Sequence, residues 1–369
     1  MLNRRHFLQA TTATVALPPL LASHAQAATV PAAEAGWRQY DITTVVEVGE
    51  RTPTTRLWLP VPARELAGYQ QTLAARFEAP GASHAGWVRS PAGAEMLAVD
   101  WQGSGQPQRV EMTHRVALRD RSVDLGADAR AGLVLPAAER RRWLQGSALK
   151  PLDGVVHETA QRIVREAGAQ TDLEKGHAVY DWIVANCHRE GAVRGCGTGD
   201  VRYVLTSGNL GGKCADLNGL FVALTRASGV PARDAYGVRV DDSARGFKSL
   251  GKSGDITRAQ HCRAEFYANG YGWIPVDPAD VRKVVLEEEK GGIPVGDPRV
   301  RAARALLFGA WEMNWLAYNH AEDVALAGSR PALSAGFLMY PNGQTAQGQL
   351  DSLDPDNFRY RISARRVQA

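Results

Sequence analysis

The pattern of apolar and polar positions changes character about a third of the way along the chain. Up to residue 122, short runs rich in Val, Thr, Leu and aromatic residues alternate with clusters of Gly, Pro and Ser. Such runs predict β-strands bounded by turns. The clearest are YDITTVVEV, TTRLWLPVP, MLAVDW and RVEMTHRVAL. We therefore expect residues 37–122 to form a small β-sandwich.

Further along, the apolar positions follow a helical period. One helical face runs through residues 152–167, and Thr171 with Glu174 gives the pattern of a capping box for a second helix that ends near Cys187. A third helix is predicted in GGKCADLNGLFVALTRASGVPAR, where Gly229 and Pro231 act as stop signals.

Strand-like text follows these helices, in DAYGVRV and AEFYANGYGWIPVD, and residues 298–308 predict one more helix. Helices followed by strands in one region indicate an α+β domain. The predicted organisation is a leader, a β-sandwich-like N-terminal domain, an α+β domain and a C-terminal extension packing on the core: residues 1–27, 28–145, 146–290 and 291–369.

The leader has the features of an export signal. Arg4 and Arg5 precede an apolar run, and Ala25–Ala27 forms a small-residue cleavage site. An arginine pair in this position resembles a twin-arginine signal, which exports folded proteins. The apolar run is too short to span a bilayer. We therefore predict a periplasmic or secreted protein without stable membrane insertion.

The overall charge of the chain argues against nucleic acid as a partner. The chain has 43 Lys and Arg against 39 Asp and Glu, a formal net charge of +4. Such a balanced chain is not expected to bind nucleic acid through its overall charge.

One segment fits a nucleotide-binding pattern but lacks the structural context that the pattern needs. GFKSLGKS, residues 246–253, fits the phosphate-loop spacing. A phosphate loop needs a helix directly after it. Here Gly254 and strand-like text follow instead, so we expect a Gly/Ser/Lys loop, with a position beside the active site as one option.

Four cysteines are too few for a disulfide scaffold. Cys187 and Cys196 are close enough in sequence to form a disulfide, and either Cys196 or Cys262 could line a site. His188 adds a metal-binding alternative, although the spacing matches no standard zinc motif.

Cys214 is the candidate nucleophile, because it lies at the predicted start of a helix. Unpaired N–H groups and the helix dipole stabilise a thiolate there. Gly211 and Gly212 would leave room for a substrate carbonyl, and the Cys214 N–H could donate to an oxyanion. Asn209 is a candidate second donor, with a turn residue as the alternative. A buried structural cysteine is the other interpretation of Cys214.

The candidate base is His261, and Asp277 is the candidate orienting acid, with Asp280 as its rival. The two lie on neighbouring strands of a predicted hairpin. They share a face only if the hairpin loop has an odd number of residues or a strand is bulged. We therefore predict a three-residue loop centred on Asn269 or Gly270, or a bulge.

These segments resemble three motifs of the transglutaminase-like (papain-like) superfamily: GGKCADLNGLFVALTRASGVPAR, HCRAEFY and GYGWIPVDPAD. The resemblance implies a helix-borne cysteine packed on an antiparallel sheet and a catalytic triad of Cys214, His261 and Asp277. It also implies an exported bacterial protein with an all-β region ahead of a catalytic domain at 146–290. One departure is Arg263, where many members have an aromatic residue, and it bears on substrate preference.

The implied activity is acyl transfer or hydrolysis at peptide or protein amide bonds through a thioester, with no cofactor or metal. Alternatives are a periplasmic cysteine peptidase, an amidase of cell-wall peptides, and a binding module without activity. Trp311 and Trp315 are candidates to wall the cleft, although packing is their commoner role.

Overall fold

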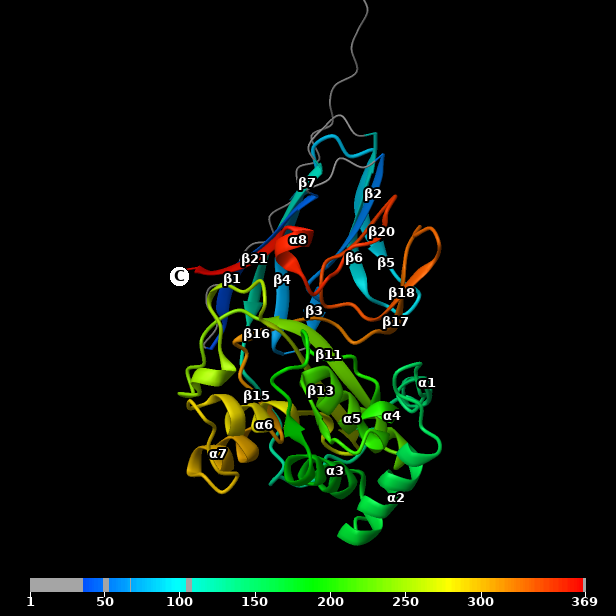
Figure 1. Cartoon of the computed structure of the whole chain (residues 1–369). Helices are drawn as coiled ribbons and strands as arrows, with labels where there is room; N and C mark the ends of the chain where they lie inside the picture. The colour runs from blue at the N-terminus through cyan, green and yellow to red at the C-terminus, as the bar shows by residue number, and fades with distance from the viewer. Residues whose placement is uncertain (1–35, 49–52, 67, 104–107, 368–369) are drawn as a thin grey trace, which may run out of the picture.

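The computed structural model describes residues 36–48, 53–66, 68–103 and 108–367. The predicted leader, residues 1–27, lies outside this range. Figure 1 shows a β-rich half at the top, with a mixed half below that carries most of the helices. The α+β fold with an N-terminal β region is therefore confirmed.

Two antiparallel sheets make up the upper half. The larger has the order β12-β21-β1-β7-β4-β3 and the smaller has the order β20-β19-β2-β6-β5. The larger sheet is built from Gly254–Asp255, Tyr360–Val367, Arg38–Val48, Gln108–Leu118, Gln70–Glu78 and Glu65–Leu66, in that order. The smaller sheet is built from Gly348–Gln349, Asn342–Thr345, Thr54–Pro60, Glu95–Gln102 and His84–Arg89, in that order.

The C-terminal segment was expected to pack on the core, but part of it joins the N-terminal sandwich instead. β21 pairs with β1 along eight residue pairs, and β19 pairs with β2. The N-terminal sandwich is therefore completed by strands from beyond residue 340. Local sequence patterns could not show this pairing because the partners are separated by about 300 positions.

Two strands of the sandwich were not predicted from the sequence. The β4 segment itself consists largely of Ala and polar residues, and β5 begins inside a Gly/Ser cluster, a pattern that indicates a loop. Both are paired in register, β4 with β7 and β5 with β6. Tertiary pairing outweighs weak strand propensity in these segments.

The core of the lower half is a four-stranded sheet with the order β14-β13-β11-β16. Its strands are Gly272–Val276, Gln260–Ala268, Ala232–Arg239 and Trp315–Asn319, in that order. Three two-stranded pairs surround it: β10-β9 (Gly211–Gly212 with His188–Arg189), β15-β8 (Ala310–Trp311 with Arg121–Ser122) and β17-β18 (Glu322–Leu326 with Leu333–Phe337).

Helices cover one side of this sheet. α5 packs directly on β13 and β11, α2 and α3 pack on α5, and α6 packs on α3, α5 and α7. The helices and the one 3-10 turn are α1 Ala137–Arg142, α2 Val155–Ala167, α3 Asp172–Asn186, α4 Val201–Thr206, α5 Cys214–Ala227, η1 Lys248–Leu250, α6 Pro278–Glu287, α7 Pro298–Leu306 and α8 Pro355–Phe358. The predicted helices at 152–167, 171–187, 214–227 and 298–308 are confirmed within a few residues, and the Thr171–Glu174 capping box is present.

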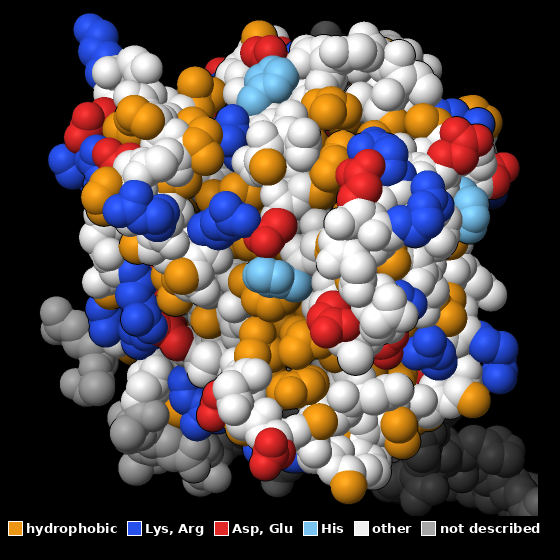
Figure 2. All heavy atoms as spheres, turned by 90° about the horizontal axis from the view of Figure 1, so that it is seen from below, with side chains coloured by type: hydrophobic (Ala, Val, Ile, Leu, Met, Phe, Trp, Pro, Cys, Tyr) orange, Lys and Arg blue, Asp and Glu red, His pale blue; other side chains and the backbone are white. Residues whose placement is uncertain are grey.

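α5 is buried along almost its whole length, which makes it the central helix of the lower half. Within the described part of the chain, no helix combines the length and apolar character that crossing a bilayer requires. Seen from below, this half shows hydrophobic side chains gathered in the middle of the face, with most Lys and Arg nearer its margins (Figure 2).

Candidate active site

The hairpin that carries His261 has the predicted geometry. β13 and β14 pair with Ala268 opposite Gly272, which leaves a three-residue loop centred on Gly270. Gly270 has φ +85°, a left-handed conformation that suits glycine in such a loop. Because the register preserves parity, His261 and Asp277 lie on the same face, and the prediction is confirmed.

His261 and Asp277 are in contact. His261 Nε2 lies 2.7 Å from Asp277 Oδ2, and both residues are buried. With Nε2 engaged by the carboxylate, Nδ1 is the ring nitrogen left for exchange with a thiol. Asp280 also approaches Nε2, at 3.3 Å. The rival acid from the sequence analysis is therefore a second neighbour of the imidazole.

Two further donors hold the Asp277 carboxylate in place. Asp277 is the N-cap of α6, and its Oδ1 accepts the Asp280 N–H at 3.0 Å. Asn218 Nδ2 donates to the same oxygen at 3.0 Å and to the Cys262 carbonyl at 2.8 Å. Asn218 lies one turn after Cys214 on α5. Asn218 was not predicted as a site residue, although a polar residue in an apolar helix is an available signal.

Asp280 is neutralised by Arg239, another residue that was not predicted from the sequence. Arg239 Nη2, from the end of β11, lies 2.6 and 2.8 Å from the two Asp280 oxygens, and Nη1 donates to the Leu250 carbonyl. Burial would raise the pKa of Asp280, but Arg239 and His261 hold that pKa well below its usual value.

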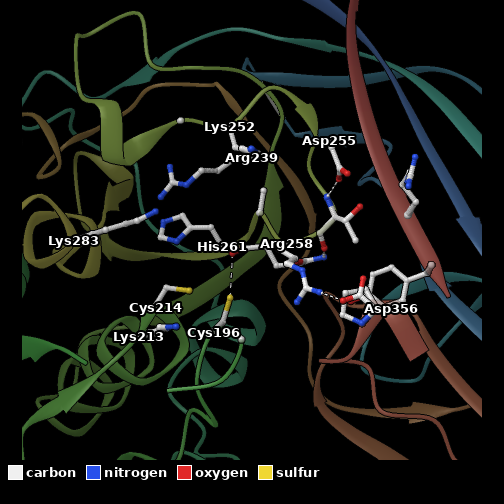
Figure 3. A pocket seen from close by; sticks show the side chains of 18 of the residues that line it. Cys196, Lys213, Cys214, Arg239, Lys252, Asp255, Arg258, His261, Lys283 and Asp356 are labelled. Carbon is white, nitrogen blue, oxygen red and sulfur yellow. Dashed lines mark hydrogen bonds and ion pairs between the residues drawn. The ribbon is translucent and has the colours of Figure 1, made fainter. Parts of the chain in front are cut away.

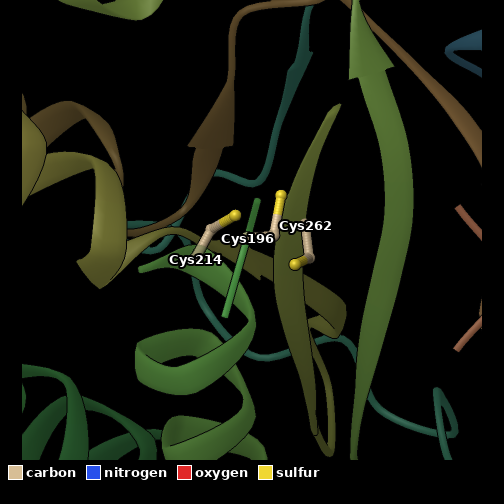
Figure 4. Close-up of side chains that lie close together, drawn as sticks. All are labelled: Cys196, Cys214 and Cys262. Atoms are coloured by element: carbon tan, nitrogen blue, oxygen red, sulfur yellow. The ribbon is translucent and has the colours of Figure 1, made fainter. Parts of the chain in front are cut away.

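Cys214 begins α5, as predicted, and contacts two further thiols. The sulfur atoms of Cys196, Cys214 and Cys262 lie within 4.8 Å of one another (Figure 4). All four cysteines, including Cys187, are free thiols in the described chain. The disulfide considered between Cys187 and Cys196 is not formed. Burial raises the pKa of Cys187 to about 12, which is typical of an inert structural thiol.

Opposite pKa shifts characterise the cysteine and the histidine. Burial would raise the pKa of Cys214, but hydrogen bonds from Cys196 and Cys262 and the charge of His261 outweigh burial, and the pKa falls well below its ordinary value. Burial would lower the pKa of His261, but Asp280, Asp277 and Cys214 raise it to about 10. Together these shifts favour a thiolate beside an imidazolium.

The loop that carries Cys196 is fixed to the start of α5. Ala215 N–H donates to the Cys196 carbonyl at 2.8 Å, and Asp216 accepts from the Gly199 and Lys213 N–H groups at 2.9 Å each. Cys196 Sγ in turn lies 3.2 Å from the Gln260 carbonyl. This loop therefore brings a second thiol to Cys214.

Gly211 and Gly212 do not have the predicted role of making room for substrate. A Cβ on Gly212 would lie 2.5 Å from the Asp216 side chain, and one on Gly211 would lie 2.5 Å from the His188 ring. Protein atoms fill that space. Asn209, the candidate oxyanion donor, is an exposed turn residue bonded to Ser207.

The face of β13 behind the triad is buried rather than open. Arg263 lies over the rings of Trp311 and Trp315 and donates to the Glu312 carbonyl at 2.9 Å. The Trp315 indole N–H donates to the His261 carbonyl at 2.8 Å. The two tryptophans therefore pack behind the histidine and do not wall the cleft, and Arg263 lies 3.5 Å from Asp277.

Cys214 and His261 line a cleft of about 1040 Å³. Figure 3 shows both side chains on its wall beside Cys196, Lys213 and Lys283. Residues of the sandwich, including Val45 and Arg361, form another wall. The loop with the phosphate-loop pattern contributes Lys252, and it runs into β12 with no helix after it. The absence of a helix directly after this loop in the described chain agrees with the expectation that the motif does not bind a nucleotide.

Comparisons with known proteins agree with this architecture. Residues 157–278 match the model of the transglutaminase-like superfamily. An uncharacterized protein of Haemophilus influenzae is 34% identical over 321 residues, covering 83% of this chain and 85% of that protein. The likeness therefore extends well beyond the segments that carry Cys214, His261 and Asp277, and the chain belongs to the transglutaminase-like superfamily.

Solved structures show more distant similarity. A candidate cysteine protease from Cytophaga hutchinsonii has a TM-score of 0.48 and 16% identity, covering 90% of this chain and 99% of that one. The periplasmic domain of TgpA from Pseudomonas aeruginosa has a TM-score of 0.35 and 16% identity, covering 68% of this chain and 90% of that one.

Proposed function

We propose that this protein is a cysteine-dependent enzyme that acts on peptide or protein amides, with Cys214, His261 and Asp277 as its catalytic triad. The observation that carries the proposal is the position of Cys214 and His261 together on the wall of one cleft, with Asp277 buried behind the imidazole at 2.7 Å from its Nε2. Cys214 is the first residue of a helix of 14 residues, so the helix dipole and the free N–H groups at the helix start favour the thiolate form of its side chain.

The proposed reaction begins with attack of the Cys214 thiolate on the amide carbonyl carbon. The carbon–sulfur bond forms, and the resulting oxyanion accepts a hydrogen bond from the Cys214 N–H. The His261 imidazolium transfers its proton to the leaving nitrogen, the carbon–nitrogen bond breaks and the amine departs. A thioester remains on Cys214.

A second nucleophile completes the cycle. An amine or a water molecule gives its proton to His261 and attacks the thioester, and the thiolate leaves. Asp277 keeps the imidazole in the tautomer that serves both steps, as an orienting acid does in other triads. Transfer to an amine makes the protein a transglutaminase, whereas transfer to water makes it a peptidase or an amidase, with cell-wall peptides among the candidate substrates.

Export is part of the proposal. The arginine pair and cleavage pattern of residues 1–27 support a periplasmic or secreted location. Replacing Arg4 and Arg5 by lysine should retain the protein in the cytoplasm, and cell fractionation with antibody detection measures this. Unchanged export of the variant would contradict the twin-arginine route.

The rate of iodoacetamide labelling at Cys214 against pH tests the activated thiol. The wild type should label at a rate that persists well below the pKa of an ordinary thiol, and His261→Ala should lose most of this rate at neutral pH. Labelling that follows an ordinary thiol in both proteins would favour a binding module. Incorporation of a fluorescent primary amine into a glutamine peptide then separates transferase from hydrolase.

A further inference from the structure

The cleft around Cys214 has an unbalanced charge. Of the described residues that line it, eight are Lys or Arg and four are Asp or Glu. The chain as a whole is nearly balanced, with 43 basic and 39 acidic residues. The positive charge is therefore concentrated at the proposed site rather than spread over the molecule.

Internal ion pairs account for only part of this charge. Three lining arginines pair with lining carboxylates: Arg189 with Glu287, Arg258 with Asp356 at 2.5 Å, and Arg359 with Glu47 at 3.3 Å. Arg239 is neutralised from outside the cleft by Asp280. Asp255, the fourth lining carboxylate, accepts the Thr257 N–H at 3.0 Å.

Three cations have no carboxylate of the described residues within ion-pair distance: Lys213, Lys252 and Arg361. Hydrogen bonds from Thr257 lower the pKa of Asp255. Arg361 and Lys252 lower this pKa further from a greater distance, but this single carboxylate can balance only one of them. They come from three different parts of the fold. Lys213 directly precedes the nucleophile, Lys252 lies on the loop before β12, and Arg361 lies on β21. Cations therefore reach the cleft both from the core and from the sandwich.

A fourth cation lies beside the histidine. The Lys283 side chain points toward His261 in Figure 3 and is 17% exposed. Its contact with Glu287, at 3.6 Å, is shared with Arg189. Burial, and then repulsion from Arg239, lower the pKa of Lys283. An anion bound here would relieve both costs.

Resting on the proposed function, we propose that the substrate of this site is a peptide that carries carboxylate groups close to the amide under attack. Carboxylates would pair with Lys213 and Lys283 next to the reacting atoms, and with Lys252 and Arg361 further along the cleft. A nucleic acid is a poorer match, because Tyr360 is the one aromatic residue among the described lining residues and is 5% exposed, which leaves no stacking platform.

Binding to the full-length protein with Cys214→Ser tests the proposal without turnover. Two blocked peptides with the same central glutamine are compared, one flanked by Asp and Glu and its twin flanked by Asn and Ser. We expect the acidic peptide to bind at least ~10-fold more tightly by calorimetry at low salt, because several unpaired cations contribute. The difference should shrink at high salt, where exposed charges are screened.

Charge reversal locates the effect. Lys252→Glu with Arg361→Glu should weaken binding of the acidic peptide by about 5- to 25-fold and leave the twin unchanged. Both residues are exposed, so folding should persist, and a melting curve checks this. The matched control is Arg165→Glu, an exposed arginine at the end of α2 outside the cleft, which should change nothing.

Each outcome decides the proposal. Equal binding of the two peptides, or no effect of the double reversal, would overturn it, and so would equally tight binding of a single-stranded oligonucleotide of the same charge. A reactive Cys214 in the labelling experiment together with equal peptide binding would overturn this inference alone. Tight acidic-peptide binding with an ordinary Cys214 thiol would instead overturn the enzymatic proposal.

Discussion

Two buried ionic networks lie at opposite ends of β11. At its start, Lys150 Nζ lies 3.1 Å from Asp234 and 3.0 Å from Glu322, and Arg226 lies 2.9 Å from Glu322. At its end, Arg239 joins the network of Asp280, His261 and Asp277 described above. We call the first group, Lys150, Arg226, Asp234 and Glu322, the Lys150 network.

The difference between them lies in chemistry rather than in burial. The Lys150 network has two cations and two carboxylates and contains neither a thiol nor an imidazole. Burial raises the pKa of Asp234 to about 6, but this carboxyl lies outside the cleft around Cys214. The triad network adds Cys214 and His261, which line the cleft. Buried charge alone therefore does not mark a catalytic site. A thiol and an imidazole at the boundary with a cleft distinguish it.

The largest expected effect comes from a substitution in the proposed triad itself. Cys214→Ser should reduce amide turnover by at least ~1000-fold, because the hydroxyl lacks the stabilised anion, while the melting temperature changes little. The matched control is Cys187→Ala, a buried thiol away from the cleft, which should keep its turnover. Comparable turnover in Cys214→Ser and wild type would remove Cys214 from the mechanism.

A substitution in the Lys150 network should lower the stability of the fold. Lys150→Met leaves two buried carboxylates with one cation, and we expect the free energy of unfolding to fall by about 3–5 kcal/mol. Urea titration measures this, with the exposed Lys290→Met as the control. The folded fraction should retain its labelling rate at Cys214. A loss of labelling with no loss of stability would contradict the separation of the two networks.

Within the triad network, the two aspartates should differ. Asp277→Asn should lower kcat by roughly 100-fold, since its carboxylate lies closest to the imidazole and holds the tautomer. Asp280→Asn should cost less, because its charge is already shared with Arg239. Steady-state kinetics on one peptide compares them, and the reverse order would make Asp280 the orienting acid.

The smallest effect is a difference in how stability depends on pH. Lys150 and Arg226, against the cost of burial, lower the pKa of Glu322 to about 2, so its contribution is present above about 4.5 and is lost as pH falls toward 2. The pKa of His261 is raised to about 10 from 6.5, so its contribution is present below 6.5 and is lost as pH rises toward 10.

Urea titrations across pH measure both contributions. Glu322→Gln should flatten the acid side of the stability profile, and His261→Gln should flatten the alkaline side. If the free energy of unfolding of a variant depends on pH with the same slope as that of the wild type, the replaced group does not titrate in the folded protein.

The triad and its hairpin could be predicted because the information is local. Motif order pairs His261 with Asp277, and strand parity then predicts the three-residue loop or bulge that such a pair requires; the loop is present. Asn218 and Arg239 were missed because their roles depend on which strand end and helix turn meet in space. β21 was missed as a sandwich strand for the same reason, since its partner β1 lies at the other end of the described chain.

The pairing of β21 with β1 has a consequence for the order in which the protein matures. A chain emerging from the ribosome presents Cys214, His261 and Asp277 long before residues 360–367, which supply Arg361 and complete one wall of the cleft. An unfinished chain therefore contains Cys214, His261 and Asp277 without one wall of the cleft. Under the proposed function, the order of synthesis thus delays completion of the cleft until the last strand is made.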